Sequence, residues 1–368
     1  MHVDWRWIKQ RPHFLAEELS KDYDVLVLYR PNLRRLTLPR NASSVHRLAF
    51  LPIPRSHDRV ARALDQMCQR MWLTLIGWLF KPDIVWLTFP TLHRYLPFSL
   101  RSKPIVYDCM DDAVGFTADR REAERIVATE RRVVQAAGLI LCTSQYLLNR
   151  ITERYRSSIV RPPVLIRNAI SRELLEDVAR RFDYHRPRHK SRTATSSPYK
   201  VAYVGTVGNW VDLDSLTHCV ELLGDVQFEL VGPVLLRHRL AVERIVYHGA
   251  VEHSGLLTHV ERFDAFIMPF VLNDLTRGVD PVKLYEYLAF GKEVVSVFYD
   301  ELKRFAPFVH FYTSWNELVA ILRSLIDETA IRKNTREKTL PFLQENTWVS
   351  RASDIKQWGL EAMIAGPR

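Results

Sequence analysis

The chain has 368 residues, 47% of them hydrophobic and 26% charged, which fits a soluble globular protein with room for two domains. Its four cysteines lack C-x-x-C spacing, which argues against a disulfide frame or a zinc site and indicates reduced core thiols of a cytoplasmic protein. The most apolar uncharged run, Met71 to Phe80, is too short to span a bilayer, and M-H-V-D-W-R-W lacks the apolar region of a signal peptide.

The net charge of +10 is unevenly distributed along the chain. Residues 1–170 carry 27 Lys and Arg against 16 Asp and Glu, whereas the remaining residues carry 25 against 26. A basic N-terminal half is attracted to anionic lipid headgroups, to a lipid-diphosphate acceptor or to nucleic acid. Charge alone does not choose among these partners.

The N-terminal half alternates between strand and helix patterns. We predict helices over Arg11–Leu19, 58–80, 120–137 (capped by Gly138) and from Ser144 onward. We predict strands over 23–29, 44–50, 82–89, 104–107, 139–143 and 164–167. This alternation is typical of an α/β domain with a parallel sheet.

The predicted helix over 58–80 carries an apolar stripe, which Trp72, Trp78 and Phe80 broaden, and arginines lie on its other side. The stripe consists of Val60, Ala63, Leu64, Met67, Met71, Leu75 and Leu79. Such a helix usually packs its stripe onto a sheet, which is the interpretation we favour. A basic amphipathic helix with tryptophans can also lie in a membrane interface.

Carboxylates gather after the predicted strand 104–107, in the segment Asp108-Cys109-Met110-Asp111-Asp112. Ligands of α/β sheets bind at this carboxyl edge of the strands. Asp111 or Asp112 could act as a general base, since repulsion between adjacent carboxylates raises a pKa. The alternative is a helix N-cap, a common role for Asp before a helical segment.

Residues 183–200 are basic, contain Ser, Thr and Pro, and predict a linker or an exposed loop. The alternation then resumes, with predicted strands over 199–204, 228–231, 245–247, 265–268, 294–298 and 308–312, and helices over 212–223 and 315–326. A glycine-containing loop, Gly205-Thr206-Val207-Gly208-Asn209-Trp210, follows the first of these strands, although one G-x-x-G is weak by itself.

The segment from Asp264 to Phe298 predicts strand, loop, helix and strand, with a helix that Asp280-Pro281 opens and Gly291 closes. Lys283 and Glu286 share one face near the helix start. A helix start with an ammonium group suits a diphosphate, and a carboxylate one turn further can accept hydrogen bonds from a ribose diol. The alternative is a surface helix with an ordinary ion pair.

The segment P-V-K-L-Y-E-Y-L-A-F-G-K-E-V-V resembles the nucleotide-binding motif of GT-B-fold glycosyltransferases, close to glycosyltransferase family 4 and its teichuronic-acid-type bacterial members. The resemblance implies that Glu286 holds the nucleotide ribose, that residues 277–282 cradle the diphosphate, and that Lys283 and Arg277 supply cations. The family has a glutamate where this chain has Gly278, so we expect Asp280 to substitute in contacting the donor sugar.

Further segments carry weaker resemblances. W-R-W-I-K-Q-R-P is similar to the family's first strand-to-helix loop, which places Trp7, Gln10 and Arg11 in the inter-domain cleft; the strand expected before it is reduced to Met1–Val3. The alternative is that the tryptophans are core aromatics and Arg11 a solvated cap. The resemblance places a catalytic residue in the Asp111–Asp112 loop. Its donor-site positions are matched by the following residues: Gly205, Thr206, Asn209, Gly232 and His248.

The sequence therefore predicts an α/β protein of GT-B architecture, with two Rossmann-like domains whose parallel sheets face each other across a cleft. The expected parts are an acceptor-binding domain (1–170), a hinge or linker (171–198), a nucleotide-sugar-binding domain (199–340) and a C-terminal helix crossing back (341–368). The expected activity is metal-independent transfer of a sugar from a UDP- or GDP-sugar to a glycan or lipid-linked acceptor in bacterial cell-surface polysaccharide synthesis. No cofactor and no nucleic acid are expected.

We expect the protein in the cytoplasm, with peripheral contact to the anionic inner face of the membrane. Three alternatives differ in measurable ways. A sugar-nucleotide epimerase of similar architecture would turn over donor without an acceptor. A degenerate glycosyltransferase acting as a scaffold would bind nucleotide without turnover. A nucleic-acid-binding module would explain the charge but not the carboxylates at strand ends.

Overall fold

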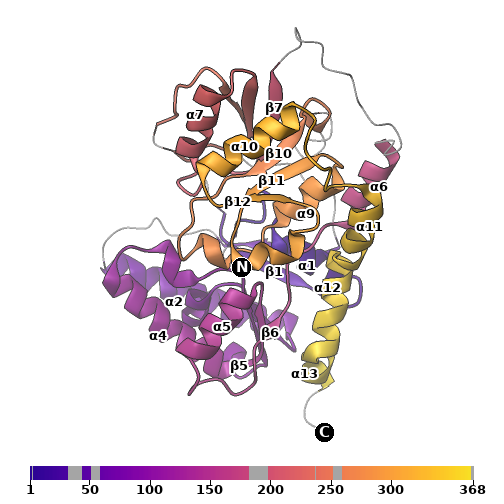
Figure 1. Ribbon diagram of the computed structural model, residues 1–368. Helices are drawn as coiled ribbons and strands as arrows, with labels where there is room; N and C mark the ends of the chain where they lie inside the picture. The colour runs from indigo at the N-terminus through magenta and orange to yellow at the C-terminus, as the bar shows by residue number, and fades with distance from the viewer. Residues whose placement is uncertain are drawn as a thin grey trace. The chain divides into compact units, whose positions relative to one another are not determined.

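The computed structural model describes residues 1, 3–31, 44–50, 59–181, 198–236, 238–251 and 259–365. Contacts within the chain divide it into two compact units (Figure 1). Unit 1 comprises residues 1–168 together with 348–368, and unit 2 comprises residues 169–347. Each unit is an α/β structure built on parallel strands.

Unit 2 is built on six parallel strands in the order β12-β11-β10-β7-β8-β9. Their bounds are β7 Tyr199–Val204, β8 Val226–Val231, β9 Ile245–Gly249, β10 Ala265–Met268, β11 Glu293–Val297 and β12 His310–Tyr312. Chain order reverses between β7 and β10, because the chain moves outward from β7 to β9 and then returns to β10 on the other side. This is the strand order of dinucleotide-binding sheets, which bind ligands at the reversal.

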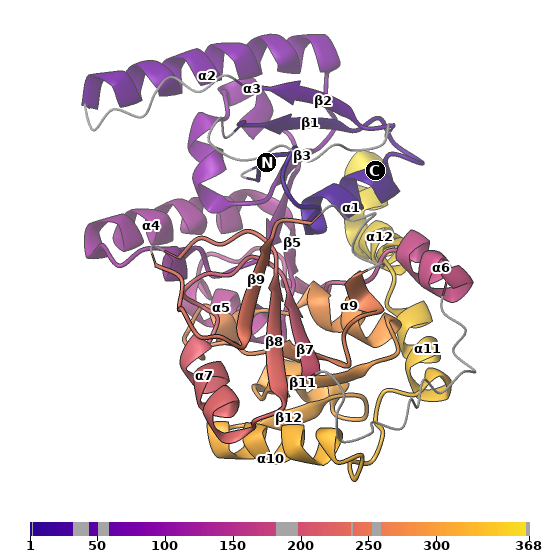
Figure 2. The same ribbon diagram turned by 90° about the horizontal axis from the view of Figure 1, so that it is seen from above.

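Helices cover both faces of this sheet (Figure 2). One group contains α7 (Leu213–Leu222) and α10 (Trp315–Ile326), which contact each other. The other contains α6 (Arg172–Arg181), α9 (Val282–Ala289) and α11 (Arg336–Glu345). Short 3-10 turns, η3 (Thr276–Gly278) and η4 (Asp300–Phe305), flank α9 and β11. With both faces covered, the four central strands β11, β10, β7 and β8 are mostly buried, whereas the edge strands β9 and β12 are partly exposed.

Unit 1 contains a four-stranded parallel sheet in the order β3-β4-β5-β6 and a separate parallel pair, β1-β2. The strands are β1 Leu26–Tyr29, β2 His46–Ala49, β3 Val85–Leu87, β4 Ile105–Cys109, β5 Ala137–Cys142 and β6 Val164–Leu165. The helices and turns are α1 Arg11–Leu19, α2 Arg59–Phe80, η1 Pro90–Tyr95, α3 Phe98–Arg101, η2 Ala113–Phe116, α4 Arg120–Ala136, α5 Gln145–Arg154, α12 Trp348–Ile355, η5 Lys356–Leu360 and α13 Glu361–Ala365.

Most predicted elements are confirmed, and two have exactly the predicted helix bounds, α1 and α10. Ser144 and Asp212, where we predicted that helices begin, are the N-caps of α5 and α7, because each side chain accepts a hydrogen bond from the backbone of its helix. Gly138 is not a helix cap: α4 ends at Ala136 and Gly138 lies within β5. The strand begins at once because Ala137 is already extended and pairs with Ile105 of β4.

The range 171–198, predicted as a linker, begins with helix α6. It folds because Leu174 and Val178, one turn apart, are buried in the core of unit 2. The rest of the predicted linker, residues 182–197, lies outside the described part of the chain.

Helix α2 differs most from expectation. The apolar stripe that we expected to pack on the sheet is exposed, and Leu73 and Ile76 are buried instead. No helix among the described residues combines the length and apolarity that a membrane crossing requires.

Candidate functional site

Two glycines bring the ends of β7 and β8 close together in unit 2. The N–H of Gly205 donates to the Val231 carbonyl at 2.7 Å, and the N–H of Gly232 donates to the Gly249 carbonyl at 2.7 Å. A Cβ at Gly232 would lie 2.1 Å from the Gly205 carbonyl oxygen, and the φ of Gly232 is +144°. Only glycine fits there, so the close approach of the two loops depends on it.

Tyr287 anchors helix α9 to the end of β7. Its hydroxyl accepts from the N–H of Val204 at 2.8 Å and donates to the carbonyl of the same residue at 3.2 Å. Its ring stacks on Phe266 of β10 with centroids 4.6 Å apart. Helix α9 is therefore held at the point where the strand order reverses.

This anchoring puts Lys283 against the glycine loop. A Cβ at Gly205 would lie 2.2 Å from Cε and 2.8 Å from Nζ of Lys283. Burial lowers the pKa of Lys283, and the nearby Glu286 carboxylate partly opposes that shift. Among the described residues, no hydrogen bond reaches either the Lys283 ammonium or the Glu286 carboxylate. A partly desolvated cation without a hydrogen-bonded partner can bind an anion strongly.

The other predicted donor-site residues lie around the same edge. Thr206 is half-buried, and its carbonyl accepts from the Tyr203 hydroxyl at 3.1 Å. Asn209 and Arg277 are exposed, the latter on η3. His248 on β9 pairs with Glu229 of β8, a partner that the sequence analysis missed.

Asp280 does not stand open to a donor sugar. Its carboxylate is buried and forms an ion pair with Arg304, and it accepts from the Tyr285 hydroxyl at 3.3 Å. The Arg304 guanidinium also lies over the Tyr285 ring, 4.9 Å from the centroid. The predicted sugar contact is therefore wrong, because Asp280 holds the start of α9 to η4. Only the tertiary structure brings Arg304 next to Asp280, so no local pattern could have revealed it.

In unit 1, Asp111 and Asp112 follow β4 but have different surroundings. Asp111 is half-buried, and no side chain of the described residues donates a hydrogen bond to its carboxylate. Burial, with the charges of Asp108 and Asp112, raises the pKa of Asp111 to about 6. Such a carboxyl can exchange a proton near neutral pH.

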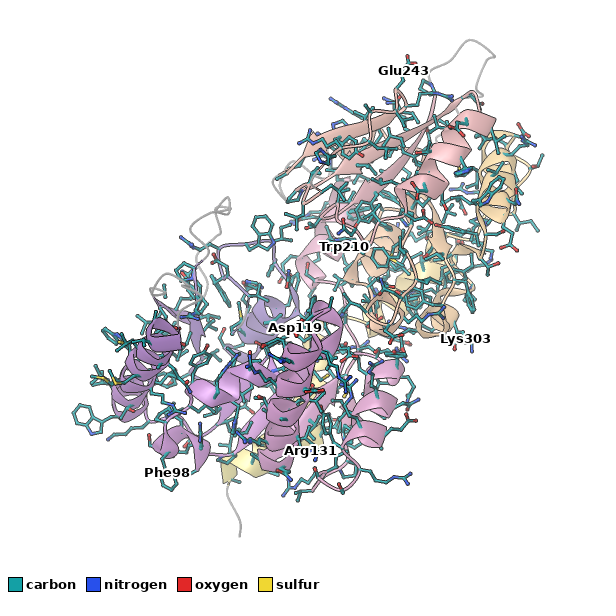
Figure 3. All side chains as sticks on the ribbon, turned by 90° about the vertical axis from the view of Figure 1, so that its left-hand side faces the viewer. Phe98, Asp119, Arg131, Trp210, Glu243 and Lys303 are labelled. Carbon is teal, nitrogen blue, oxygen red and sulfur yellow. The ribbon has the colours of Figure 1, made fainter. Side chains whose placement is uncertain are left out.

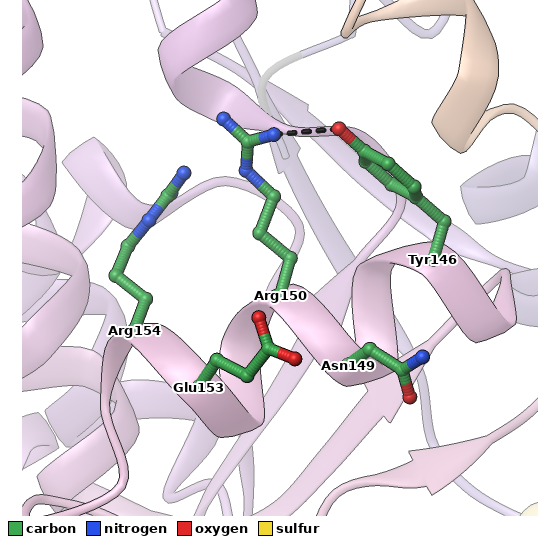
Figure 4. A pocket seen from close by; sticks show the side chains of 5 residues that line it. All are labelled: Tyr146, Asn149, Arg150, Glu153 and Arg154. Atoms are coloured by element: carbon green, nitrogen blue, oxygen red, sulfur yellow. Dashed lines mark hydrogen bonds between the residues drawn. The ribbon is translucent and has the colours of Figure 1, made fainter.

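Asp112 is a structural residue. Its side chain accepts from the N–H of Val114 at 3.3 Å, as an N-cap does. It also pairs with Arg150 at 2.6 Å and with Arg154 at 3.3 Å. Both arginines lie on α5, where Arg150 also donates to the Tyr146 hydroxyl at 2.6 Å (Figure 4). Asp112 is 4% exposed and is held by two guanidinium groups, so the structure does not support its predicted role as a catalytic base.

Of the three predicted acceptor contacts, two lie in the interior of unit 1. Arg11 is 3% exposed and donates from Nε to Asp108 at 2.9 Å and from Nη1 to the Ile166 carbonyl at 2.9 Å. Trp7 is also buried. Both predictions are corrected, because these side chains present almost no surface to an acceptor. Gln10 is exposed, forms the N-cap of α1, and stays a prediction.

Among the described residues, no three His, Cys, Asp or Glu side chains are arranged to hold a metal ion.

The chain is similar in fold to solved glycosyltransferase structures. Sucrose-phosphate synthase from Thermosynechococcus elongatus superposes with a TM-score of 0.69 at 14% identity, covering 96% of this chain and 93% of that one. HepE of Anabaena, solved with UDP and glucose, has a TM-score of 0.61 at 15% identity and covers 94% of each chain. WaaG, a glycosyltransferase involved in lipopolysaccharide biosynthesis, has a TM-score of 0.63 at 11% identity, covering 96% and 95%.

The molecule thus has the GT-B fold, with two Rossmann-like units, as the sequence predicts. In sequence it is 25% identical over 224 residues to TuaH of Bacillus subtilis (strain 168), a protein provisionally named as a teichuronic acid biosynthesis glycosyltransferase. The match covers 57% of this chain and 54% of TuaH, so the chain spans about half the length of this curated relative. No protein-family model matches the chain. The resemblance to teichuronic-acid-type glycosyltransferases is confirmed by this relative.

Proposed function

We propose that the protein is a glycosyltransferase that moves a sugar from a nucleoside diphosphate sugar to a hydroxyl of a glycan or lipid-linked acceptor. The observation that carries the proposal is the packing of Lys283 against Gly205, with Glu286 one turn further along α9. The similarity to TuaH and the fold shared with glycosyltransferases support it, and they favour a role in bacterial cell-surface polysaccharide synthesis.

In this proposal, unit 2 binds the donor. Backbone N–H groups of the Gly205–Asn209 loop, the Lys283 ammonium and Arg277 stabilise the negative charge that grows on the departing diphosphate. Glu286 accepts hydrogen bonds from the ribose hydroxyls. Because fixed cations and amides carry the charge stabilisation, we expect transfer to proceed in the presence of EDTA.

Unit 1 supplies the acceptor side. Asp111 takes the proton of the attacking hydroxyl, because it is the carboxyl of its loop whose pKa is raised to about 6 while Asp112 is ion-paired. Gln10 is the remaining acceptor contact that we propose from the sequence.

The nucleotide that we propose is UDP rather than GDP. Its support is the fold similarity to HepE, whose structure was solved with UDP and with UDP plus glucose. We include His248 and Gly232 among the residues that flank the nucleotide, since both lie at strand ends of the same sheet edge.

The test is thermal stability with a panel of UDP, GDP, ADP, CMP and dTDP, with and without EDTA. A nucleotide that binds the folded state stabilises it by mass action and therefore raises the melting temperature. At a nucleotide concentration a hundred times the Kd, the free energy of unfolding rises by about 2.7 kcal/mol. We expect a shift with UDP that EDTA does not change and that Glu286→Ala abolishes. A Glu286→Ala protein that binds UDP as tightly as the parent refutes the ribose assignment.

Turnover separates the enzyme classes. UDP release from a UDP-sugar that requires an acceptor supports a transferase, whereas donor conversion without acceptor supports an epimerase. Nucleotide binding with no turnover under any condition supports a scaffold.

A further inference from the structure

Helix α2 presents an apolar face to solvent. Its stripe members recur at spacings of three and four residues, so they lie on one side of the helix. Their exposed fractions are Val60 63%, Leu64 48%, Met67 53%, Met71 65%, Leu75 46%, Trp78 70% and Leu79 65%. Isolated exposed apolar residues are ordinary, but a contiguous stripe of this length marks an interaction surface.

The opposite side of α2 is already used for packing within unit 1. Leu73 and Ile76 are each 9% exposed. A Cβ at Gly77 would lie 3.0 Å from the Leu100 side chain, so α2 packs closely on α3. Near the start of the helix, Asp65 pairs with Arg30 at 2.6 Å. These contacts fix the rotation of α2 and leave the stripe pointing away from the unit.

The exposed side is rich in aromatic rings. Trp72 is 56% exposed and Trp78 is 70% exposed. Phe98, on the neighbouring α3, is 88% exposed, and Figure 3 shows its ring at the edge of the ribbon. Tryptophan favours the boundary between lipid headgroups and acyl chains, because one end of the ring is polar and the rest is apolar.

The surroundings of the stripe are basic. Residues 59–103 contain seven Lys and Arg and only two acids, Asp65 and Asp83. Arg70 and Arg101 both donate to the Arg94 carbonyl, at 2.9 Å and 3.4 Å, so two guanidinium groups lie close together beside α2. One of the two acids, Asp65, is neutralised by Arg30. This balance is complementary to an anionic surface.

We propose that the outer face of α2, together with Phe98, binds the surface of an anionic phospholipid bilayer, with the helix lying in the plane of the interface. The apolar stripe enters the headgroup region while the arginines contact lipid phosphates. A second copy of the chain fits less well, because a symmetric contact would bring the same arginines together. The inference uses no residue of the nucleotide site and does not depend on the proposed activity.

The experiment is co-sedimentation of the full chain with vesicles of phosphatidylcholine alone or with about 30% phosphatidylglycerol. We expect binding to the anionic vesicles, little binding to the neutral ones, and release by about 0.5 M NaCl. The variant carrying Met71→Glu and Trp78→Glu should lose binding at least about tenfold, since it places two charges in the apolar face.

Trp358→Glu is the matched control, because Trp358 is 62% exposed in the same unit and lies outside α2. It should bind vesicles like the parent. Circular dichroism and the melting temperature establish that each variant is folded. If the double variant unfolds, Phe98→Ser replaces it, with an expected loss of about threefold.

Three results overturn the proposal. They are no binding of the parent to anionic vesicles, equal binding of parent and folded α2 variant, and equal binding to neutral vesicles. A parent dimer that the α2 variant dissociates, without vesicle binding by either, assigns the face to a second copy instead. None of these measurements uses a nucleotide, so their outcome is separate from that of the UDP test.

Discussion

Asp111 and Asp112 are adjacent in sequence, yet they have opposite electrostatic surroundings. Asp112 contacts two arginines of α5, whereas Asp111 is half-buried and lies near the carboxylates of Asp108 and Asp112. The same loop therefore contains one ion-paired carboxylate and one carboxyl whose pKa is raised to about 6. The chemistry of each follows from its neighbours in space.

The first residue-scale prediction concerns the pH dependence of transfer. A general base works only when deprotonated, so kcat/KM should fall as pH drops below the pKa of Asp111, which is about 6. Initial rates of UDP release between pH 5 and 8 measure this. Asp111→Asn should be inactive at all these pH values, and an unchanged pH profile in that variant would remove Asp111 from the reaction.

The second residue-scale prediction concerns how the stability of the folded protein depends on pH. A carboxyl whose pKa rises from 3.8 in the unfolded chain to about 6 in the folded protein binds more protons when folded. Its ionisation therefore destabilises the fold progressively as pH rises from about 4 to 6. Asp111→Asn should stabilise the protein by about 1–2 kcal/mol at pH 7.5, a figure reduced for partial solvent exposure, and hardly at all at pH 4. Urea unfolding at the two pH values measures the difference.

At the scale of elements, the proposed donor site depends on how α9 packs against the loops that follow β7 and β8. Tyr287 fixes the helix to β7, and Gly232 lets the loops after β7 and β8 approach each other. Gly232→Ala forces a Cβ against the Gly205 carbonyl and strains the backbone. We therefore expect the free energy of unfolding to fall by about 3 kcal/mol or more. Gly224→Ala in the same unit is the control, because a Cβ there meets nothing within 4 Å. Equal melting temperatures for the two variants would contradict this account.

Lys283 is the charged part of the same element. Removing a charge-assisted contact to phosphate typically costs about 1.5–3 kcal/mol, so Lys283→Ala should raise the Kd for UDP about tenfold or more. Lys303→Ala is the matched control, since Lys303 is 69% exposed and pairs with Asp300 at the surface (Figure 3). Calorimetric titration with UDP compares the two, and similar affinities would show that Lys283 is only a packing residue.

At the scale of the whole molecule, the last helices belong with the first residues of the chain. Residues 348–368 are part of unit 1, where the Trp348 ring stacks on Phe14 with centroids 5.0 Å apart. Trp348 is 1% exposed, so Trp348→Ala should lower the free energy of unfolding by about 3–5 kcal/mol. Trp358 is 62% exposed, so Trp358→Ala should lower the free energy of unfolding by less than about 0.5 kcal/mol. Denaturant unfolding measures both, and equal losses would refute the packing argument.

The sequence by itself determined the α/β alternation, most element bounds and the segment around Lys283 and Glu286. These follow from local causes: apolar periodicity, caps such as Ser144 and Asp212, and turn residues. The division of the chain into a basic N-terminal half and a nearly neutral C-terminal half also follows directly from the sequence.

Only the tertiary structure decided which polar residues remain available for chemistry. Arg304 neutralises Asp280, Arg150 neutralises Asp112, and Asp108 neutralises Arg11, and each partner lies at least 24 positions away. The rotation of α2, which exposes the stripe, is likewise set by Leu73 and Gly77 packing on distant residues. Burial and charge pairing are properties of neighbours in space, and the order of residues along the chain does not specify those neighbours locally.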